Sequence, residues 1–311
     1  MSNEDIVKQL LESAGLEPAQ VQEANVARLQ VHGNRVIGSH LVPGLDVDVQ
    51  EEQDGINATI IVREGTRIVN PVHLCFGLIP DSGVQLIDMD VRIEREAQAT
   101  VWAHCTFPNA VDVTHKMDAR IDVGPGASYS YIERHVHGPA GGVVVLPKAH
   151  VNLRENASYR TEFELIKGRI GHMEIDYETD CAAGCVLEMT VRVAGRGDDT
   201  LIIRETGHLN GEKSRAVLQS YIALREDARA EVFNTITADA DGARGHVDCK
   251  EIVQDRAHAK AVPIVDVRHP GAHVTHEAAI GSVDNKQLET LLARGLFEDQ
   301  AVDLIIEGLL Q

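Results

Sequence analysis

The sequence predicts a mainly β protein: a parallel β-helix flanked by α-helices at both ends. Three observations carry this prediction. Short apolar runs and glycine-containing turns alternate over most of the chain, in a pattern that recurs. Helical periodicity is confined to the two ends. Aromatic residues make up only 4% of the 311 residues, so the core must be built from Val, Ile, Leu and Ala.

Residues 1–35 are expected to form an N-terminal helical segment. Ser2 and Asp5 have the spacing of a capping box, and Gly15 ends the pattern that follows. The apolar face of this helix consists of Ile6, Leu10 and Leu11. A second, shorter helix is expected after residues 17–18, where proline occupies a first-turn position.

Residues 36–283 are expected to form the β-helix core. The repeat reads apolar-x-apolar, three mostly polar residues, alanine, one further residue and a second alternating run. Its alanines are Ala97, Ala127, Ala157 and Ala228. The thirty residues between the first three repeats are too few for a strand–helix–strand unit but suit a coil of strands and tight turns. A large jelly roll or double sandwich is the alternative architecture.

Residues 284–311 are expected to form a C-terminal helical hairpin. Asp284 can cap the first helix, which Gly295 ends. The apolar face of this helix consists of Leu288, Leu291 and Leu292. A second amphipathic helix follows over residues 298–310. The hairpin is too acidic to be a DNA-binding motif.

Composition and missing motifs exclude several functions. The net charge of −19 argues against nucleic acid or an anionic membrane as a partner. The N-terminus has no apolar signal sequence, and no run of 18 apolar residues follows, so we expect a cytoplasmic protein. The chain has no phosphate-binding P-loop, no dinucleotide-binding glycine motif and no serine-hydrolase elbow. An ATPase or a dinucleotide enzyme is therefore not expected.

The cysteines and histidines offer several candidate metal ligands. In a reducing compartment the five cysteines are expected to be thiols or metal ligands: Cys75, Cys105, Cys181, Cys185 and Cys249. Cys181 and Cys185 are separated by three residues, which is not the zinc spacing, and are read as incidental cysteines at a turn. His135 and His137 share one face of a strand, the spacing of cupin metal sites. An exposed polar strand end is the other interpretation.

Cys249, His276 and Glu277 form the stronger constellation. His276 stands four residues after Ala272, where the other repeats have neutral residues: Val101, Tyr131, Thr161, Val232 and Ala261. A buried imidazole at this position must find a partner. A thiolate, an imidazole and a carboxylate together suit iron or zinc. His276 and Glu277 are adjacent, so on a strand they should point to opposite faces.

Three segments resemble the SufB/SufD family of iron–sulfur cluster assembly proteins. The first is the cysteine after the turn "ARGHVD", which is Cys249. The second is the run "PxxxVxxPxAxVxHEA" at 263–278, and the third is the tail "DxxQLxxLxxRGLxxxxAxxLIxxGLL" at 284–310. The resemblance is specific over roughly 220–311 and extends more loosely through the upstream repeats. It implies a right-handed parallel β-helix with helical ends.

The resemblance also assigns residues. Cys249 matches the cysteine of the SufB core, and His276 and Glu277 match its His-Glu pair, so these three would bind the cluster. SufD has glycine where Glu277 stands, which makes this chain SufB-like. Cys105, with its neighbour His104, is the candidate for the upstream cysteine at which SufB accepts sulfur.

The function implied is that of a scaffold rather than an enzyme. The chain would build a transient iron–sulfur cluster, of the 4Fe-4S type, and pass it to apo iron–sulfur proteins. It would act as a homodimer with a SufC-like ABC ATPase, docked on the C-terminal helices, that supplies ATP hydrolysis. One alternative is a SufD-like structural subunit that binds the ATPase but no cluster. A β-helix enzyme acting on carbohydrate is the other, although one Trp and five Tyr provide few sugar platforms.

Overall fold

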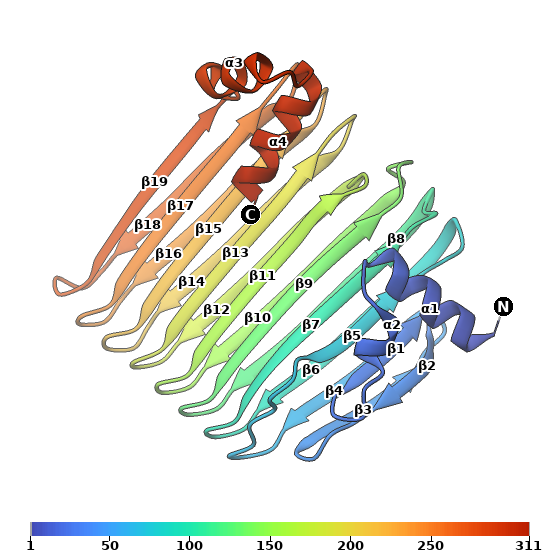
Figure 1. Ribbon diagram of the computed structural model, residues 1–311. Coiled ribbons are helices and arrows are strands. Elements are labelled where there is room, and N and C mark those ends of the chain that lie inside the picture. Colours follow the sequence, from blue (N-terminus) through green and yellow to red (C-terminus); the bar gives the residue numbers. More distant parts are fainter. Residues whose placement is uncertain (1, 311) are drawn as a thin grey trace.

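The computed structural model describes residues 2–310 and consists of a long β-solenoid with helices at its two ends (Figure 1). The helices are α1 (Asn3–Ser13), α2 (Pro18–Val21), α3 (Asn285–Ala293) and α4 (Glu298–Leu310). Odd-numbered and even-numbered strands separate into two sheets over most of the chain, because each coil contributes one strand to each sheet.

One sheet has ten strands, in the spatial order β19-β17-β15-β13-β11-β9-β7-β5-β1-β2. Their bounds are β1 (Arg28–His32), β2 (Arg35–His40), β5 (Val72–Gly77), β7 (Gln98–Phe107), β9 (Ser128–His137), β11 (Ser158–Lys167), β13 (Val186–Gly195), β15 (Arg215–Leu224), β17 (Arg244–Val253) and β19 (His273–Gly281).

The other sheet has nine strands, in the order β18-β16-β14-β12-β10-β8-β6-β4-β3. Their bounds are β3 (Leu45–Glu51), β4 (Gly55–Val62), β6 (Ser82–Ile93), β8 (Asp112–Val123), β10 (Val143–Leu153), β12 (His172–Cys181), β14 (Thr200–Leu209), β16 (Arg229–Ala238) and β18 (His258–Val267).

Strand direction confirms the parallel β-helix. Every neighbouring pair from β5 and β6 onward is parallel, and only β1–β2 and β3–β4, at the N-terminal end, are antiparallel. A jelly roll or sandwich would be antiparallel throughout, so that alternative is wrong. The first strand begins at Arg28, within the range 1–35 that the sequence pattern assigns to the N-terminal helical segment.

The register explains the repeat and corrects one part of its alignment. His276 belongs to a column of inward-facing residues in the ten-stranded sheet, one from each coil: Val101, Tyr131, Thr161, Met189, Leu218, Val247 and His276. Val232 and Ala261 pair with each other in the nine-stranded sheet instead. The alanine-containing turn occurs at both corners of a coil. Aligning the repeats on this alanine therefore superposes strands that belong to different sheets.

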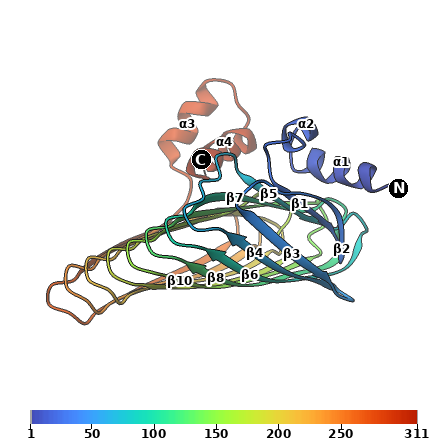
Figure 2. The same ribbon diagram turned by 90° about the horizontal axis from the view of Figure 1, so that it is seen from below.

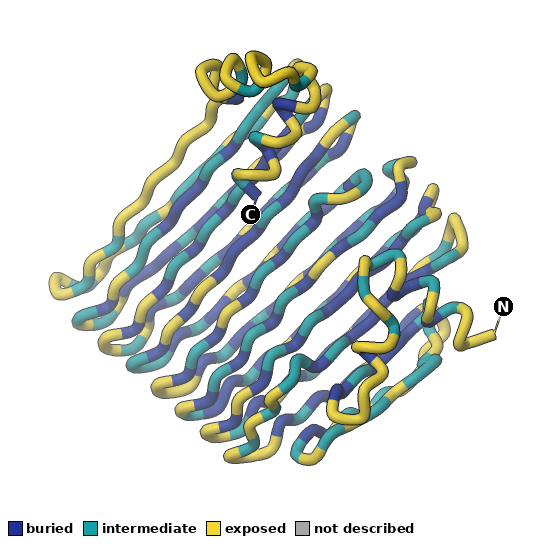
Figure 3. Tube along the Cα trace, viewed as in Figure 1, coloured by how far each residue is buried: buried dark blue, intermediate teal, exposed yellow. Residues whose placement is uncertain are grey.

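Buried positions recur along the strands of both sheets (Figure 3). The inward-facing side chains fill the interior between the sheets and are mostly apolar. Tyr129 and Tyr159, on adjacent coils, stack with ring centroids 5.7 Å apart. Each large apolar side chain buried in this way contributes roughly 1.5–3 kcal/mol relative to exposure. In the described part of the chain no further coil follows the terminal strand β19, and the residues of this strand are mostly exposed. The solenoid interior is therefore closed along its length but open at its C-terminal end.

Both helical ends lie against the outer face of the ten-stranded sheet (Figure 2). The capping box of α1 is confirmed, since Ser2 and Asp5 exchange hydrogen bonds. Helix α4 packs on β15 through Val302, Ile306 and Leu310. No helix in the described residues combines the length and apolar character required to cross a bilayer.

Candidate functional site

Cys249 lies on β17, one strand from the C-terminal end of the ten-stranded sheet. Val247 and Cys249 alternate with outward-facing residues, and both are fully buried in the solenoid interior. In register, Cys249 lies between Ser220 of β15 and Ala278 of β19. The thiol is therefore covered by one terminal strand and by little else on that side.

His276 shares the inner face with Cys249, and Glu277 does not. His276 is paired with Val247, and Glu277 with Asp248 on the opposite face. Both residues are exposed because β19 is an edge strand. The structure thus places the thiol and the imidazole of the predicted site on the inner face of neighbouring strands. The carboxylate of Glu277 lies on the outer face, where Asp248 above all, and Glu277 to a smaller extent, raise the pKa of the Lys250 amine.

Two other carboxylates face the interior around Cys249. Glu205 is fully buried on β14 and Glu251 is 2% exposed on β17. Neither carboxylate has a hydrogen-bonding partner among residues 2–310. Burial raises the pKa of Glu205 to about 8 and that of Glu251 to about 7. Burial and these carboxylates together raise the pKa of Cys249 to about 12, so its thiol is protonated in the closed solenoid.

A buried hydrogen bond between two side chains lies next to Cys249. The Asn234 side-chain amide donates to the Ser220 hydroxyl over 2.6 Å, and Ser220 adjoins Cys249 in the sheet. Neither Glu205 nor Glu251 was among the residues that sequence reasoning selected. The available signal was a glutamate at the inward position of a strand whose other inward positions are apolar, as in "LIIRETGHL".

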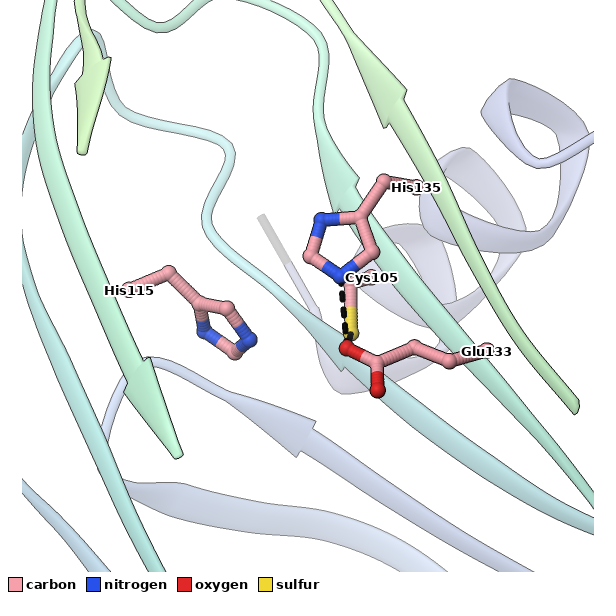
Figure 4. Close-up of side chains that lie close together, drawn as sticks. All are labelled: Cys105, His115, Glu133 and His135. Carbon is pink, nitrogen blue, oxygen red and sulfur yellow. Dashed lines mark hydrogen bonds and ion pairs between the residues drawn. The ribbon is translucent and has the colours of Figure 1, made fainter. Parts of the chain in front are cut away.

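A second polar centre lies inside the solenoid toward its N-terminal end (Figure 4). We call it the Cys105 cluster, and its members are Cys105, His115, Glu133 and His135. All four are buried, and one potential ligand atom from each lies within 4.8 Å of the others. The His135 Nε2 atom is 2.7 Å from Glu133 Oε1, and the Cys105 thiol is 3.9 Å from the same oxygen.

Burial determines the protonation of this centre. It lowers the pKa of His115, His135 and His137 to about 3, so these rings are neutral. It raises the pKa of Glu133 to about 7 and that of Cys105 well above the usual range. The interpretation of the His135–His137 pair as an exposed strand end is therefore wrong: the two side chains point into the core.

Cys105 and His104 do not act together in this structure. They are adjacent on β7, so Cys105 points inward and His104 outward, where its ring stacks on His73 with centroids 5.4 Å apart. Five strand spacings separate Cys105 from Cys249 in the ten-stranded sheet, which corresponds to about 24 Å. The two inward thiols therefore belong to separate centres.

The remaining cysteines have local partners. Cys75 packs in the apolar cluster beneath α1. The Cys185 thiol lies 2.9 Å from the carbonyl of Arg154, at a turn position that alanine occupies in other coils. Cys181 is buried among apolar residues of the core.

The family comparison agrees with this geometry. The model of the SufBD core domain of the SUF iron–sulfur cluster assembly system matches residues 80–309, which include both centres and the C-terminal helices. The chain belongs to the SufB/SufD family. Its role accordingly lies in iron–sulfur cluster assembly.

Relatives of similar length support the same assignment. The chain is 35% identical to an iron–sulfur cluster assembly SufBD family protein of Methanocaldococcus jannaschii, over 94% of this chain and 93% of the relative. It is 34% identical to one of Pyrococcus horikoshii, over 92% and 87% of the two chains. The SufB protein of Bacillus subtilis is 22% identical over 81% of this chain but only 54% of its own. The longer SufB therefore contains sequence that this chain does not match.

Proposed function

We propose that this chain is the scaffold subunit of a SUF-type complex and that an iron–sulfur cluster is built on Cys249, His276 and Glu277. The observation that carries the proposal is the place of Cys249. It lies beneath the terminal strand at the open end of the solenoid, with His276 on the same inner face. A thiol at that place is buried until β19 moves and is exposed as soon as it does.

The donor set suits a cluster that must be released. Four thiolates hold clusters tightly in electron-transfer proteins, whereas imidazole and carboxylate ligands give a more labile site. Glu205 and Glu251 add two interior carboxylates whose oxygens lack partners among the described residues. Opening the terminal coil would hydrate Cys249, lower its pKa and expose the thiolate that binds iron.

A second copy of the chain is proposed to complete the site. Beyond β18 and β19 the two sheets have no further strand in the described part of the chain, and an unpaired strand edge is a template for association. Exposed apolar residues lie on this last coil: Ile264, Val267 and Ile280. Because Glu277 lies on the outer face, a partner coil or a displaced β19 would bring it to the cluster formed on Cys249.

The C-terminal hairpin is proposed to dock a SufC-like ABC ATPase. Phe297, between α3 and α4, is 77% exposed, and Leu304 on α4 is 47% exposed. The inner side of α4 packs with Tyr221 of β15 and Ile252 of β17, three residues beyond Cys249. A movement of α4 driven by ATP in the partner would therefore reach the strand that carries the thiol. The cluster would then pass to apo acceptor proteins in the cytoplasm.

The test is anaerobic co-expression with the ATPase, followed by iron and sulfide analysis of the purified complex. Cys249→Ser and Glu277→Gln should each lose most of the cluster, while Cys181→Ser, a buried cysteine outside both centres, should retain it. A full complement of iron and sulfide on Cys249→Ser would disprove the assignment. A complex that forms normally but never holds a cluster would instead identify a SufD-like structural subunit, the alternative that Glu277 disfavours.

A further inference from the structure

The hydrogen bonds around His115 leave one ring nitrogen ready to bind a metal. The Gln85 amide nitrogen donates to the carbonyl of Gly33 over 2.9 Å, so the Gln85 amide oxygen is an acceptor. That oxygen lies 3.1 Å from His115 Nδ1, which must therefore carry the proton. His115 Nε2 is left with a free lone pair, and it has no hydrogen-bonding partner among residues 2–310.

A second chain of hydrogen bonds sets His135 in the same way. His137 Nδ1 lies 2.9 Å from the Arg169 carbonyl, to which it can only donate. In this neutral ring Nε2 is then an acceptor, and it lies 3.2 Å from His135 Nδ1. His135 Nδ1 therefore donates, and the lone pair of His135 Nε2 points toward Glu133 Oε1. Metal-binding histidines are oriented by such a donation from their other nitrogen.

Cys105 and Glu133 supply the remaining donors. The Tyr177 hydroxyl donates to Glu133 Oε2 over 3.3 Å, which leaves Oε1 directed at Cys105 and His135. A tetrahedral ion held about 2.0–2.3 Å from each ligand brings the ligand atoms to roughly 3.3–3.8 Å from one another. The four atoms already lie within 4.8 Å, so side-chain shifts of about an ångström would close the site.

We propose that the Cys105 cluster binds one divalent transition-metal ion, of the zinc or ferrous class, inside the solenoid. One thiolate, one carboxylate oxygen and two imidazole nitrogens form a closed tetrahedral set. Binding displaces the thiol proton and any proton on Glu133. The site shares no residue with the terminal coil and lies about 24 Å from Cys249, so it does not depend on the proposed scaffold role.

A hydrogen-bonded core without a metal explains these residues less well. The neutral His115 Nε2 would stay desolvated and without a partner among the described residues, which is costly in a buried site. Cys105 is paired with His135. At the corresponding level of later coils the inward residues are the apolar Val193 and Ile222, before Glu251 on β17. Four potential ligands thus converge in one section of the core and are separated from the polar residues around Cys249 by coils whose interior is mostly apolar.

The test uses the full chain carrying Cys249→Ser, so that the terminal thiol cannot contribute. The protein is stripped with chelator, unfolded, and refolded anaerobically with Co²⁺, because the site is closed in the folded state. We expect one Co²⁺ per chain, with visible bands of tetrahedral cobalt and a near-ultraviolet thiolate charge-transfer band. Zn²⁺ should displace it more readily than Fe²⁺ does, following the affinity order of divalent metals.

Point variants distinguish a loss of metal binding from a failure to refold. Adding Cys105→Ala should remove the thiolate band, and Glu133→Gln, nearly identical in shape, should weaken binding at least tenfold. Cys181→Ala is the matched control, a buried cysteine that should leave spectrum and affinity unchanged. Circular dichroism establishes that each variant has refolded. Absence of bound Co²⁺ in the folded parent, a thiolate band that persists in Cys105→Ala, or unchanged affinity in Glu133→Gln would each overturn the proposal.

Discussion

Replacing Glu205 by glutamine should change how the stability of the apo-protein depends on pH. Glu205 is fully buried, its carboxylate has no partner among the described residues, and burial raises its pKa to about 8. The unfolded chain has the ordinary carboxyl pKa of 4.5. Between these values the folded state holds a proton that the unfolded state has released. The contribution of Glu205 to the free energy of unfolding must therefore fall as pH rises.

The size of the effect follows from the two pKa values. Each pKa unit corresponds to about 1.4 kcal/mol, so the full shift is worth about 5 kcal/mol once pH exceeds the folded pKa. Between about pH 5 and about pH 7 the loss attributable to Glu205 is about 2.5 kcal/mol. Glu205→Gln has a similar shape and cannot ionise, so this part of the loss should disappear.

The assay is denaturant unfolding of wild type and variant at several pH values, followed by circular dichroism. Glu133 and Glu251 also have raised pKa values, which lower stability as pH rises, whereas the buried His115, His135 and His137 have lowered pKa values and act in the opposite direction. The prediction therefore concerns only the difference between the two proteins. Glu188→Gln removes an exposed carboxylate from β13 and should leave the pH dependence of wild type unchanged. Curves for wild type and Glu205→Gln that stay parallel from pH 5 to pH 7 would refute the reasoning.

Two further predictions concern a buried ion pair and the docking helices. Asp199 is 1% exposed and accepts from the Arg169 guanidinium and from backbone amides, whereas Asp198 binds the same arginine from a side chain that is 97% exposed. Asp199→Asn should lower the free energy of unfolding by about 2–4 kcal/mol, and Asp198→Asn should lower it by less than about 0.5 kcal/mol. Equal losses in the two variants would contradict this account. Phe297→Asp should weaken co-purification of the ATPase about tenfold or more. Val69, whose side chain is comparably exposed, lies far from the hairpin in the sequence, so Val69→Asp should leave co-purification unchanged. Unchanged binding by Phe297→Asp would mean that the ATPase docks elsewhere.

The fold could be predicted because its signals are local. The capping box at Ser2 and the alanine at many corners of the solenoid are visible in single segments, and these define the helices and the solenoid. The column of residues to which His276 belongs was harder to predict from the sequence, because the turns at both corners of a coil share one pattern. Only the register separates the two sheets.

The interior centres could be predicted only in part. Cys249 and His276 stood out because their segments match a family pattern. His115 and Glu133 come from different sheets, and nothing in either segment shows that they meet. Each is simply a polar residue in an alternating strand until the inward face is known. The useful signal was the alternation of inward and outward residues along the strand. His115 lies two residues after Val113 and two before Met117, and these two neighbours are apolar and face inward.

The position of each centre along the solenoid determines how its ligand can exchange. The Cys105 cluster lies between coils on both sides, so access requires separation of paired strands in the middle of the stack. Cys249 is covered by β19, which within residues 2–310 is paired in the ten-stranded sheet with β17 alone. Displacing that one strand exposes the thiol, whereas the strands on the N-terminal side of β17 can stay paired. A cargo that must leave is therefore better placed at the terminal coil, and an ion that must stay is better placed at Cys105.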